Sequence, residues 1–215
     1  MQTEENGRAS REEAELTESM KPAGIVGSSG ACEATGSSGS LGTSESSIEI
    51  EVSASYPAEV KHDLAGGEED PSHTHGYNLS WRPTETHIFV SAEGRRMCHI
   101  GLVRQVVEVS GAAVEVAGVG GVLVRSGERG HGYGRAAMDA AEAFAVREWK
   151  VGFLLLFCRE ALRSWYDALG WRKVLGATWA EQPSGAVVLP LESMWKSLGD
   201  GRWPDGDVYL RSRPW

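Results

Sequence analysis

The stretch VLVRSGERGHGYGRAAM, residues Val122–Met138, decides how the rest of the chain is understood. An apolar run ends at Val124, a basic loop with several glycines follows, and an alanine-rich segment continues to Trp149. A short apolar run is typical of a buried strand, and the alanine-rich segment has the periodicity of a helix. A strand, a glycine loop and a helix in this order can hold a dinucleotide, hold the phosphates of another cofactor, or form only a tight turn.

The glycine loop has the chemistry of a phosphate cradle. Its glycines let the backbone approach a ligand closely. The first N–H groups of the following helix have no partners within the helix, and they lie at the positive end of its dipole. Arg129 and Arg135 add positive charge at both ends of the loop. For an isolated glycine loop, a plain turn with solvated arginines is the simpler explanation, so the context has to decide.

The dinucleotide interpretation fails on spacing. GYGRAA, residues 132–137, fits the pattern G-x-G-x-x-G/A. In a dinucleotide-binding fold, however, the first glycine turns directly off the strand. Here the seven residues Arg125–His131 separate the strand from Gly132. The preceding strands also form a meander instead of opening a parallel unit.

The segments around the loop predict one α/β (α+β) domain that spans residues 47–215. Its sheet is mixed, mostly antiparallel, and has helices on both faces. Apolar alternation, hairpin turns and helix stop signals place the elements. The predicted order is a strand at 47–56, a helix from Pro57 to near Ala65, three strands within 87–124, a helix at 136–149, a buried strand at 151–158, a helix from Arg159 to Gly170, and strands at 186–191 and 207–210.

Arg129, Gly132 and Gly134 stand at the fixed positions of R-x-x-G-x-G/A, between a predicted strand and helix. This context resembles the acetyl-CoA signature of the Gcn5-related N-acetyltransferases, the GNAT superfamily. FLLLFC followed by a helix ending in WYDALGW is also similar to that superfamily. GVLVRSGERGHGYG and RSWYDALGW resemble the aminoglycoside 2'-N-acetyltransferases. HIGLVRQVVEV and the ending VVLPLESMWKSLGDGRWPDGDVYLRSRPW resemble the nodulation N-acyltransferases, which acylate an amino sugar.

The resemblance implies that acetyl-CoA is the co-substrate and lies where two neighbouring strands separate. Free backbone groups of one strand would hold the pantetheine arm, and the loop would hold the pyrophosphate. Tyr166, four residues before Gly170, matches the tyrosine that protonates the departing thiolate. The implied cofactor-binding residues are Val122, Leu123, Val124, Arg129, Gly130, His131, Gly132, Tyr133, Gly134 and Arg135.

The acceptor side matches the resemblance less fully. Asp207 and Tyr209 match residues that hold the charged sugar in the aminoglycoside enzymes. The glutamate that serves as their base is replaced by Gly120. Glu115 on the same strand is a second option, although a solvated carboxylate explains it more simply. Water relayed through backbone carbonyls is a third. Trp203 and Trp215 are interpreted as packing residues.

These residues predict an acetyl-CoA-dependent N-acetyltransferase that acts on a primary amine of a small acceptor, such as an amino sugar or aminoglycoside. Two alternatives stay open. One is a module that senses acyl-CoA without transferring the acyl group. The other is an N-acyltransferase that uses a longer acyl donor.

Composition narrows the classes of partner. The net charge of −9 comes from the first third, because there are 15 acidic and 4 basic residues up to Asp70, and 15 acidic and 17 basic from Pro71 onward. The absence of a basic cluster argues against nucleic acid and anionic membranes. Residues 1–46, which are acidic and rich in Ser and Gly, predict a disordered tail.

Other features of the sequence indicate a cytoplasmic protein without a metal. No apolar leader and no membrane span is seen in the sequence, so we expect a cytoplasmic location. Three scattered cysteines and the HTH sequence at 73–75 do not make a metal site, and Cys158 is interpreted as a core residue. The oligomeric state is left open, with a homodimer among the options.

Overall fold

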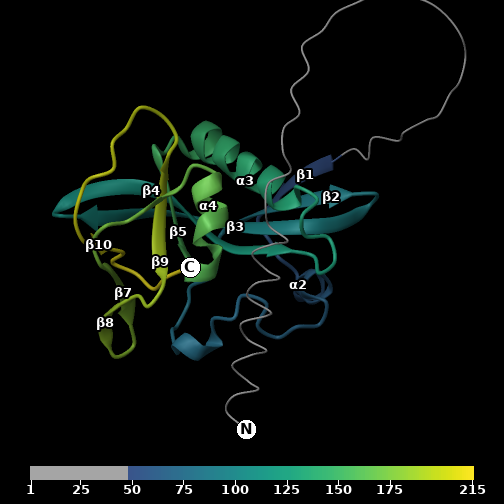
Figure 1. Cartoon of the computed structure of the whole chain (residues 1–215), viewed down its shortest axis with the longest axis horizontal. Helices are drawn as coiled ribbons and strands as arrows, with labels where there is room; N and C mark the ends of the chain where they lie inside the picture. The colour runs from purple at the N-terminus through teal and green to yellow at the C-terminus, as the bar shows by residue number, and fades with distance from the viewer. Residues whose placement is uncertain (1–47) are drawn as a thin grey trace, which may run out of the picture.

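Two long strands, β3 (Arg95–Val109) and β4 (Ala112–Val124), form the centre of a curled mixed sheet (Figure 1). The computed structural model describes residues 48–215, and the predicted tail at 1–46 lies outside the described residues. The order of the sheet is β6-β9-β5-β4-β3-β10-β7-β8, and β2 and β1 continue it beside the first half of β3. The remaining strands are β1 (Ile48–Ser53), β2 (Thr86–Ala92), β5 (Phe153–Cys158), β6 (Arg172–Lys173), β7 (Thr178–Gln182), β8 (Gly185–Val188), β9 (Glu192–Ser197) and β10 (Val208–Tyr209).

The predicted mixed and mostly antiparallel sheet is confirmed. Only β4 with β5 and β10 with β7 pair in parallel among the described strands. The meander within 87–124 forms as predicted because both of its turns contain residues that accept a positive φ. Gly94 and Gly111 take φ values of +70° and +86° there. Because β3 is so long, β2 pairs with its first half and the short β10 pairs with its last two residues, Glu108 and Val109, on the same edge.

Helices lie on both faces of the sheet, as expected. α2 (Ala58–Ala65) and α3 (Tyr133–Phe144) pack on opposite sides of β3 in Figure 1, and α4 (Arg163–Ala168) follows β5. Gly66, with φ +63°, ends α2 near the predicted residue. The shorter turns are 3-10 helices at His75–Tyr77 and Glu160–Leu162 and a π-helix at Ala145–Trp149.

Some element bounds differ from the predictions. α3 begins three residues earlier than expected, because Gly134 is helical although glycine is a weak helix former. The predicted helix from Arg159 to Gly170 forms as a 3-10 turn followed by the short α4. The strand expected at 186–191 ends at Val188, two residues before Pro190. Strands β6, β7 and β9 were not predicted from the sequence.

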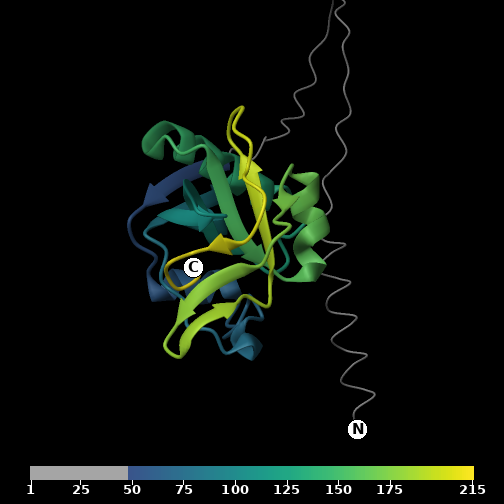
Figure 2. The ribbon, with the colours of Figure 1, turned by 90° about the vertical axis from the view of Figure 1, so that its left-hand side faces the viewer.

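The core is divided between the two faces of the sheet. On the α3 face, Met138 and Ala141 pack against Ile88, Ile100 and Leu154. On the other face, Val103, Leu155 and Trp203 belong to a second cluster. Leu154, Leu155 and Leu156 are all at most 1% exposed, so β5 is buried on both faces as its apolar run predicts. Figure 2 shows β5 and the yellow β9 side by side in this sheet.

Candidate active site

The strands β4 and β5 separate part-way along their length. They pair in parallel only over Val116–Val119 and Phe153–Leu156. Beyond Val119, β4 continues through Gly120–Val124, where its only pairing is with β3. On its other edge, β5 stays paired with β9 to its end at Cys158. Among residues 48–215, the β5-facing edge of Val122, Leu123 and Val124 therefore has no strand partner.

A β-bulge lies at the start of this separated part of β4. The register with β3 shifts between His99 and Gly101, which pair with Leu123 and Gly120 and leave one extra residue on β4. Gly121 takes φ +58°, which a side chain would strain. The carbonyl oxygen of Gly121 accepts a hydrogen bond from His99 Nδ1 at 2.8 Å. The bulge thus turns the backbone at the point where the two strands separate.

The glycine loop leads from β4 into the N-terminus of α3. Gly132 is the N-cap residue with φ +84°, and no side chain caps the helix. Gly130 also has a positive φ, of +83°. The first N–H groups of α3 therefore have no side-chain acceptor, and the helix dipole makes this end attractive to an anion. This is the geometry that a pyrophosphate-binding loop needs.

Basic side chains surround this loop. Arg129 makes no ion pair among residues 48–215, and Arg135 contacts Asp139 at 3.9 Å with more than half of each side chain exposed. His131 lies 4.0 Å from Glu128. Such exposed pairs contribute little to stability, so the charges of Arg129 and Arg135 are available to a ligand at small cost. Arg125 differs, since it is 9% exposed and pairs with Asp63 of α2.

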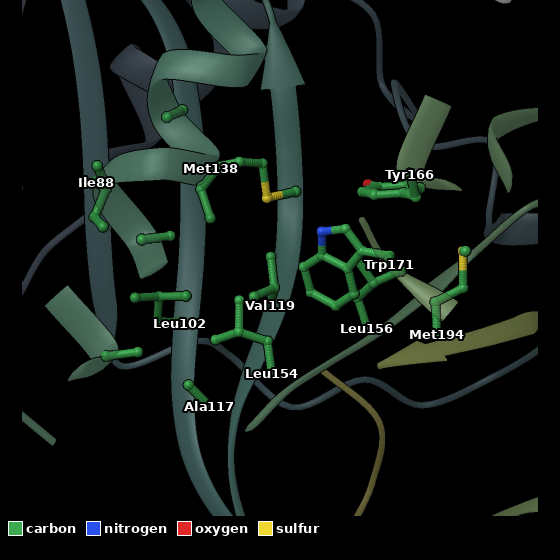
Figure 3. Close-up of a cluster of buried hydrophobic side chains, with 14 of the residues drawn as sticks. Ile88, Leu102, Ala117, Val119, Met138, Leu154, Leu156, Tyr166, Trp171 and Met194 are labelled. Atoms are coloured by element: carbon green, nitrogen blue, oxygen red, sulfur yellow. The ribbon is translucent and has the colours of Figure 1, made fainter. Parts of the chain in front are cut away.

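Tyr166 of α4 lies in the cluster on the α3 face, near Trp171, Leu156 and Met194 (Figure 3). It is 4% exposed, and its ring packs edge-on against Trp165 at 4.7 Å. Burial raises the pKa of the Tyr166 hydroxyl far above its usual value, so it keeps its proton. Trp165 in turn contacts Gly134, which also lies close to Val124. The structure therefore brings Tyr166, the N-terminus of α3 and the end of β4 together.

On the face of the sheet away from α3, the neighbouring strands β2 and β3 carry residues that the sequence did not indicate. His87 and His99 are 7% and 1% exposed, and His87 Nδ1 lies 3.0 Å from His99 Nε2. The ring of Tyr56 stacks on His99. A histidine inside an apolar strand is usually a core residue whose hydrogen bonds are made within the protein, so nothing in the sequence singles out His87 or His99. The chain of hydrogen bonds becomes visible only from the distances in the structure.

Trp215 lies beside Gly120, where the resemblance expects the base. The prediction that it packs is confirmed, because it is 6% exposed, covers Gly118 and contacts Phe157 at 5.0 Å between ring centroids. A side chain at position 120 would meet the main-chain carbonyl group of Trp215. Glu115 is exposed and pairs with Arg104 at 2.6 Å, which agrees with its interpretation as a solvated carboxylate.

The two residues predicted to hold the acceptor lie at the far end of the sheet. Tyr209 pairs with Glu108 on β3, whereas Gly120 pairs with Gly101. At about 3.3 Å per residue, these positions are roughly 23 Å apart. Asp207 Oδ1 accepts a hydrogen bond from the backbone N–H of Ala177 at 2.9 Å, and Tyr209 stacks on Trp179 at 6.0 Å. The structure does not bring Asp207 and Tyr209 to the separated strands.

A metal site and a thiol nucleophile each place particular demands on the described residues. No group of three or more His, Cys, Asp or Glu side chains in the described part of the chain could hold a metal ion. Cys158 is 5% exposed, and burial raises its pKa to about 12. It is therefore a protonated core thiol, as predicted, and not a nucleophile.

The family profile of Nodulation protein A (NodA) matches residues 75–214, which include the separated strands, the glycine loop and Tyr166. The chain belongs to the NodA family. No curated protein matches it. The structure of the GNAT-family N-acetyltransferase YhbS from Escherichia coli in complex with CoA is similar, with 13% identity, a TM-score of 0.50, and coverage of 78% of this chain and 92% of that chain. This likeness shows that this NodA-family chain has the GNAT fold.

Two further solved structures are similar at lower scores. A GNAT-family acetyltransferase from Brucella melitensis in complex with acetyl-CoA is 15% identical, with a TM-score of 0.45 and coverage of 74% of this chain and 94% of that chain. A putative N-acetyltransferase from Lactobacillus plantarum is 22% identical, with a TM-score of 0.47 and coverage of 71% and 99%. The family and the fold identify this NodA-family chain as a GNAT-type acyltransferase. None of its helices between residues 48 and 215 has the length and apolar character that a bilayer crossing requires.

Proposed function

We propose that the protein is an N-acetyltransferase that moves an acetyl group directly from acetyl-CoA to a primary amine of a small acceptor, such as an amino sugar. One observation carries the proposal. The separated ends of β4 and β5, the uncapped N-terminus of α3 and the buried Tyr166 lie next to one another. An acyl-CoA needs these three features for its pantetheine arm, its pyrophosphate and its departing thiolate.

The donor would bind with its pyrophosphate at the glycine loop. The backbone N–H groups from Arg129 to Gly134 would donate to the phosphate oxygens, and Arg129 and Arg135 would add charge-assisted contacts. The pantetheine amides would pair with the free edge of Val122–Val124, much as a further strand would. This arrangement would leave the thioester at the bulge around Gly121.

The reaction proposed is a direct displacement. The unprotonated amine attacks the thioester carbonyl carbon, and the carbonyl oxygen gains negative charge, which a backbone donor on β4 stabilises. The intermediate then expels the CoA thiolate. Tyr166, which burial keeps protonated, donates its proton to that sulfur as the C–S bond breaks, and the phenolate then takes a proton back from water. The amine passes its own proton to water, because position 120 is a glycine.

The acceptor is proposed to approach from the face away from α3. Phe157 and Trp215 border the separation point there, and these bulky rings favour a short acyl group. Asp207 and Tyr209 are kept as proposed acceptor contacts, although they lie roughly 23 Å along the sheet. Only an acceptor of several linked rings could touch both regions. An extended amino-sugar chain fits that requirement better than a single ring.

The test is release of CoA, followed with a thiol-reactive dye. The purified full chain is mixed with acetyl-CoA and with simple amines, aminoglycosides, amine-bearing peptides, glucosamine and glucosamine oligomers. Butyryl-CoA and palmitoyl-CoA replace acetyl-CoA in parallel reactions, and Tyr166→Phe serves as the matched variant. We expect release that depends on the acceptor, is fastest with acetyl-CoA, and falls in Tyr166→Phe.

Other outcomes would replace the proposal. Faster release from palmitoyl-CoA would assign the longer donor. A rise in melting temperature with acetyl-CoA, without release for any acceptor, would favour a sensor. If the chain neither binds acetyl-CoA nor releases CoA from it, the assignment of the glycine loop as a pyrophosphate site is contradicted.

A further inference from the structure

Two buried histidines and a backbone carbonyl form a continuous chain of hydrogen bonds on the face away from α3. His87 Nδ1 lies 3.0 Å from His99 Nε2, and His99 Nδ1 lies 2.8 Å from the carbonyl oxygen of Gly121. His99 is 1% exposed, so water cannot replace these contacts. The chain ends at the bulge where β4 leaves β5.

The protons in this chain have one arrangement when both rings are neutral. A carbonyl oxygen only accepts, so His99 Nδ1 must carry the hydrogen. His99 Nε2 is then a lone pair, and His87 Nδ1 must donate to it. Burial lowers the pKa of both rings, that of His99 to about 3, so His99 is neutral at pH 7. The direction of the chain is therefore fixed from His87 through His99 to Gly121.

The His99 ring is held in place by its neighbours. The ring of Tyr56 stacks on it at 3.8 Å between centroids, with an angle of 22° between the planes. Phe89 lies 5.2 Å away on the strand beside it. A Cβ on Gly121 would contact the His99 ring at 3.5 Å. His99 therefore cannot swing away from the bulge without disturbing this packing.

The geometry of a peptide unit connects this contact to the acyl-CoA side. Every peptide bond in the described residues is trans, so the C=O of Gly121 and the N–H of Val122 point in opposite directions. The His99 side chain projects from the face of the sheet away from α3, so its ring holds that C=O toward this face. The N–H of Val122 then points away from the His99 ring.

We propose that His99 is a positioning residue of the acyl-transfer site, which holds the Gly121–Val122 peptide so that the N–H of Val122 donates to the thioester carbonyl oxygen. His87 keeps His99 in the required tautomer. The inference rests on the proposed function. As the amine attacks the carbonyl carbon, the electron pair of the C=O bond moves to oxygen, and the oriented N–H stabilises that charge until the thiolate leaves.

The first measurement needs no turnover. A long-range ¹H–¹⁵N spectrum of the full chain labelled at histidine, recorded at pH 7, reports which ring nitrogen carries the proton. The His99 signals are assigned by their loss in His99→Asn. We expect protonated Nδ1 and unprotonated Nε2. A His99 ring that carries its proton on Nε2, or on both nitrogens, would overturn the proposal.

The second measurement separates a positioning role from a structural one. His99→Leu removes the ring N–H that donates to the carbonyl oxygen of Gly121. In His99→Asn, an N–H of the side-chain amide takes the place of this donor. Loss of one oxyanion donor costs about 100-fold or more in kcat, so we expect His99→Leu to lower kcat by roughly 10- to 100-fold while KM for acetyl-CoA changes little. His99→Asn should recover most of kcat.

Val107→Ala is the control for stability. Val107 is buried on the same strand, eight residues from His99. We expect it to lower the melting temperature without lowering kcat. If Val107→Ala and His99→Leu lower kcat equally, or if His99→Asn does not recover it, His99 is only a core residue. If the wild-type chain binds acetyl-CoA but transfers no acetyl group, the proposed function is wrong. The positioning role of His99 in acyl transfer is then wrong too, even if the NMR spectrum shows the expected tautomer.

Discussion

The indole of Trp215 lies directly on Gly118 of β4, in the space where a side chain at position 118 would begin. The contact joins the last residue of the sequence to the strand that separates from β5. It explains why β4 carries a glycine among its valines at that point. It also fixes the Trp215 main chain beside Gly120.

Gly118→Ala should destabilise the protein by about 1–3 kcal/mol, because the added methyl group overpacks a filled site. Gly152→Ala is the control, since a Cβ there meets nothing within 4 Å. The measurement is urea unfolding of both variants, in the wild-type and in the Trp215→Ala background. The cost of Gly118→Ala should be smaller without the indole. An equal cost in both backgrounds would show that Trp215 is not what fills the space.

Tyr166→Phe should lower kcat by about 100-fold or more, since it removes a general acid, while the melting temperature changes little. Burial raises the pKa of Tyr166, so the wild-type acid keeps its proton and kcat should not fall between pH 8 and 10 from its ionisation. The profile of kcat against pH checks this. If Tyr166→Phe keeps the wild-type kcat, Tyr166 is not the acid, and water protonates the thiolate instead.

Arg129→Ala and Arg135→Ala should each raise KM for acetyl-CoA by roughly 5- to 20-fold, the size of one partly exposed charge-assisted contact. KM for S-acetylpantetheine, a donor without a pyrophosphate, should be the same in these variants as in the wild type. Arg147→Ala, near the other end of the same helical segment, is the matched control. Equal losses with both donors would contradict the placement of the pyrophosphate at the loop.

His99 should make the protein sensitive to acid. Its pKa is lowered to about 3 in the folded state, against 6.5 in the unfolded chain, so the stabilisation is present above pH 6.5 and is lost as the pH falls toward 3. Each pH unit in this window costs about 1.4 kcal/mol for this group. His99→Asn should therefore lose less free energy of unfolding between pH 6.5 and 4.5 than the wild type. Parallel pH curves for the two proteins would contradict this.

The sequence predicted those parts of the fold whose causes are local. The meander followed from alternating residues and from turns at Gly94 and Gly111. Strand β9 was missed because ESMWKS has no clear alternation; its register comes from β5, about 40 residues earlier. The start of α3 was misplaced because packing against Val124 and Trp165 makes Gly134 helical despite its low propensity.

The sequence indicated only that part of the candidate site which is proposed to bind acyl-CoA. The loop from Arg129 to Arg135 and Tyr166 could be identified because their spacing is fixed along one stretch of chain. His99 could not, because its role depends on a bulge in the neighbouring strand and on Tyr56, 43 residues away. The placement of Asp207 and Tyr209 depends on which half of β3 the short β10 joins, and no local pattern determines that.

The way β5 is held has a consequence for the timing of synthesis. β5 shares only four residue pairs with β4 and six with β9. A growing chain that has emerged through residue 191 already contains the meander and the glycine loop, yet its β5 lacks β9, the strand with which it shares most of its pairs. Distant pairings form late compared with hairpins. If the proposed site binds acyl-CoA, the nascent protein should therefore become able to bind it only after β9 leaves the ribosome.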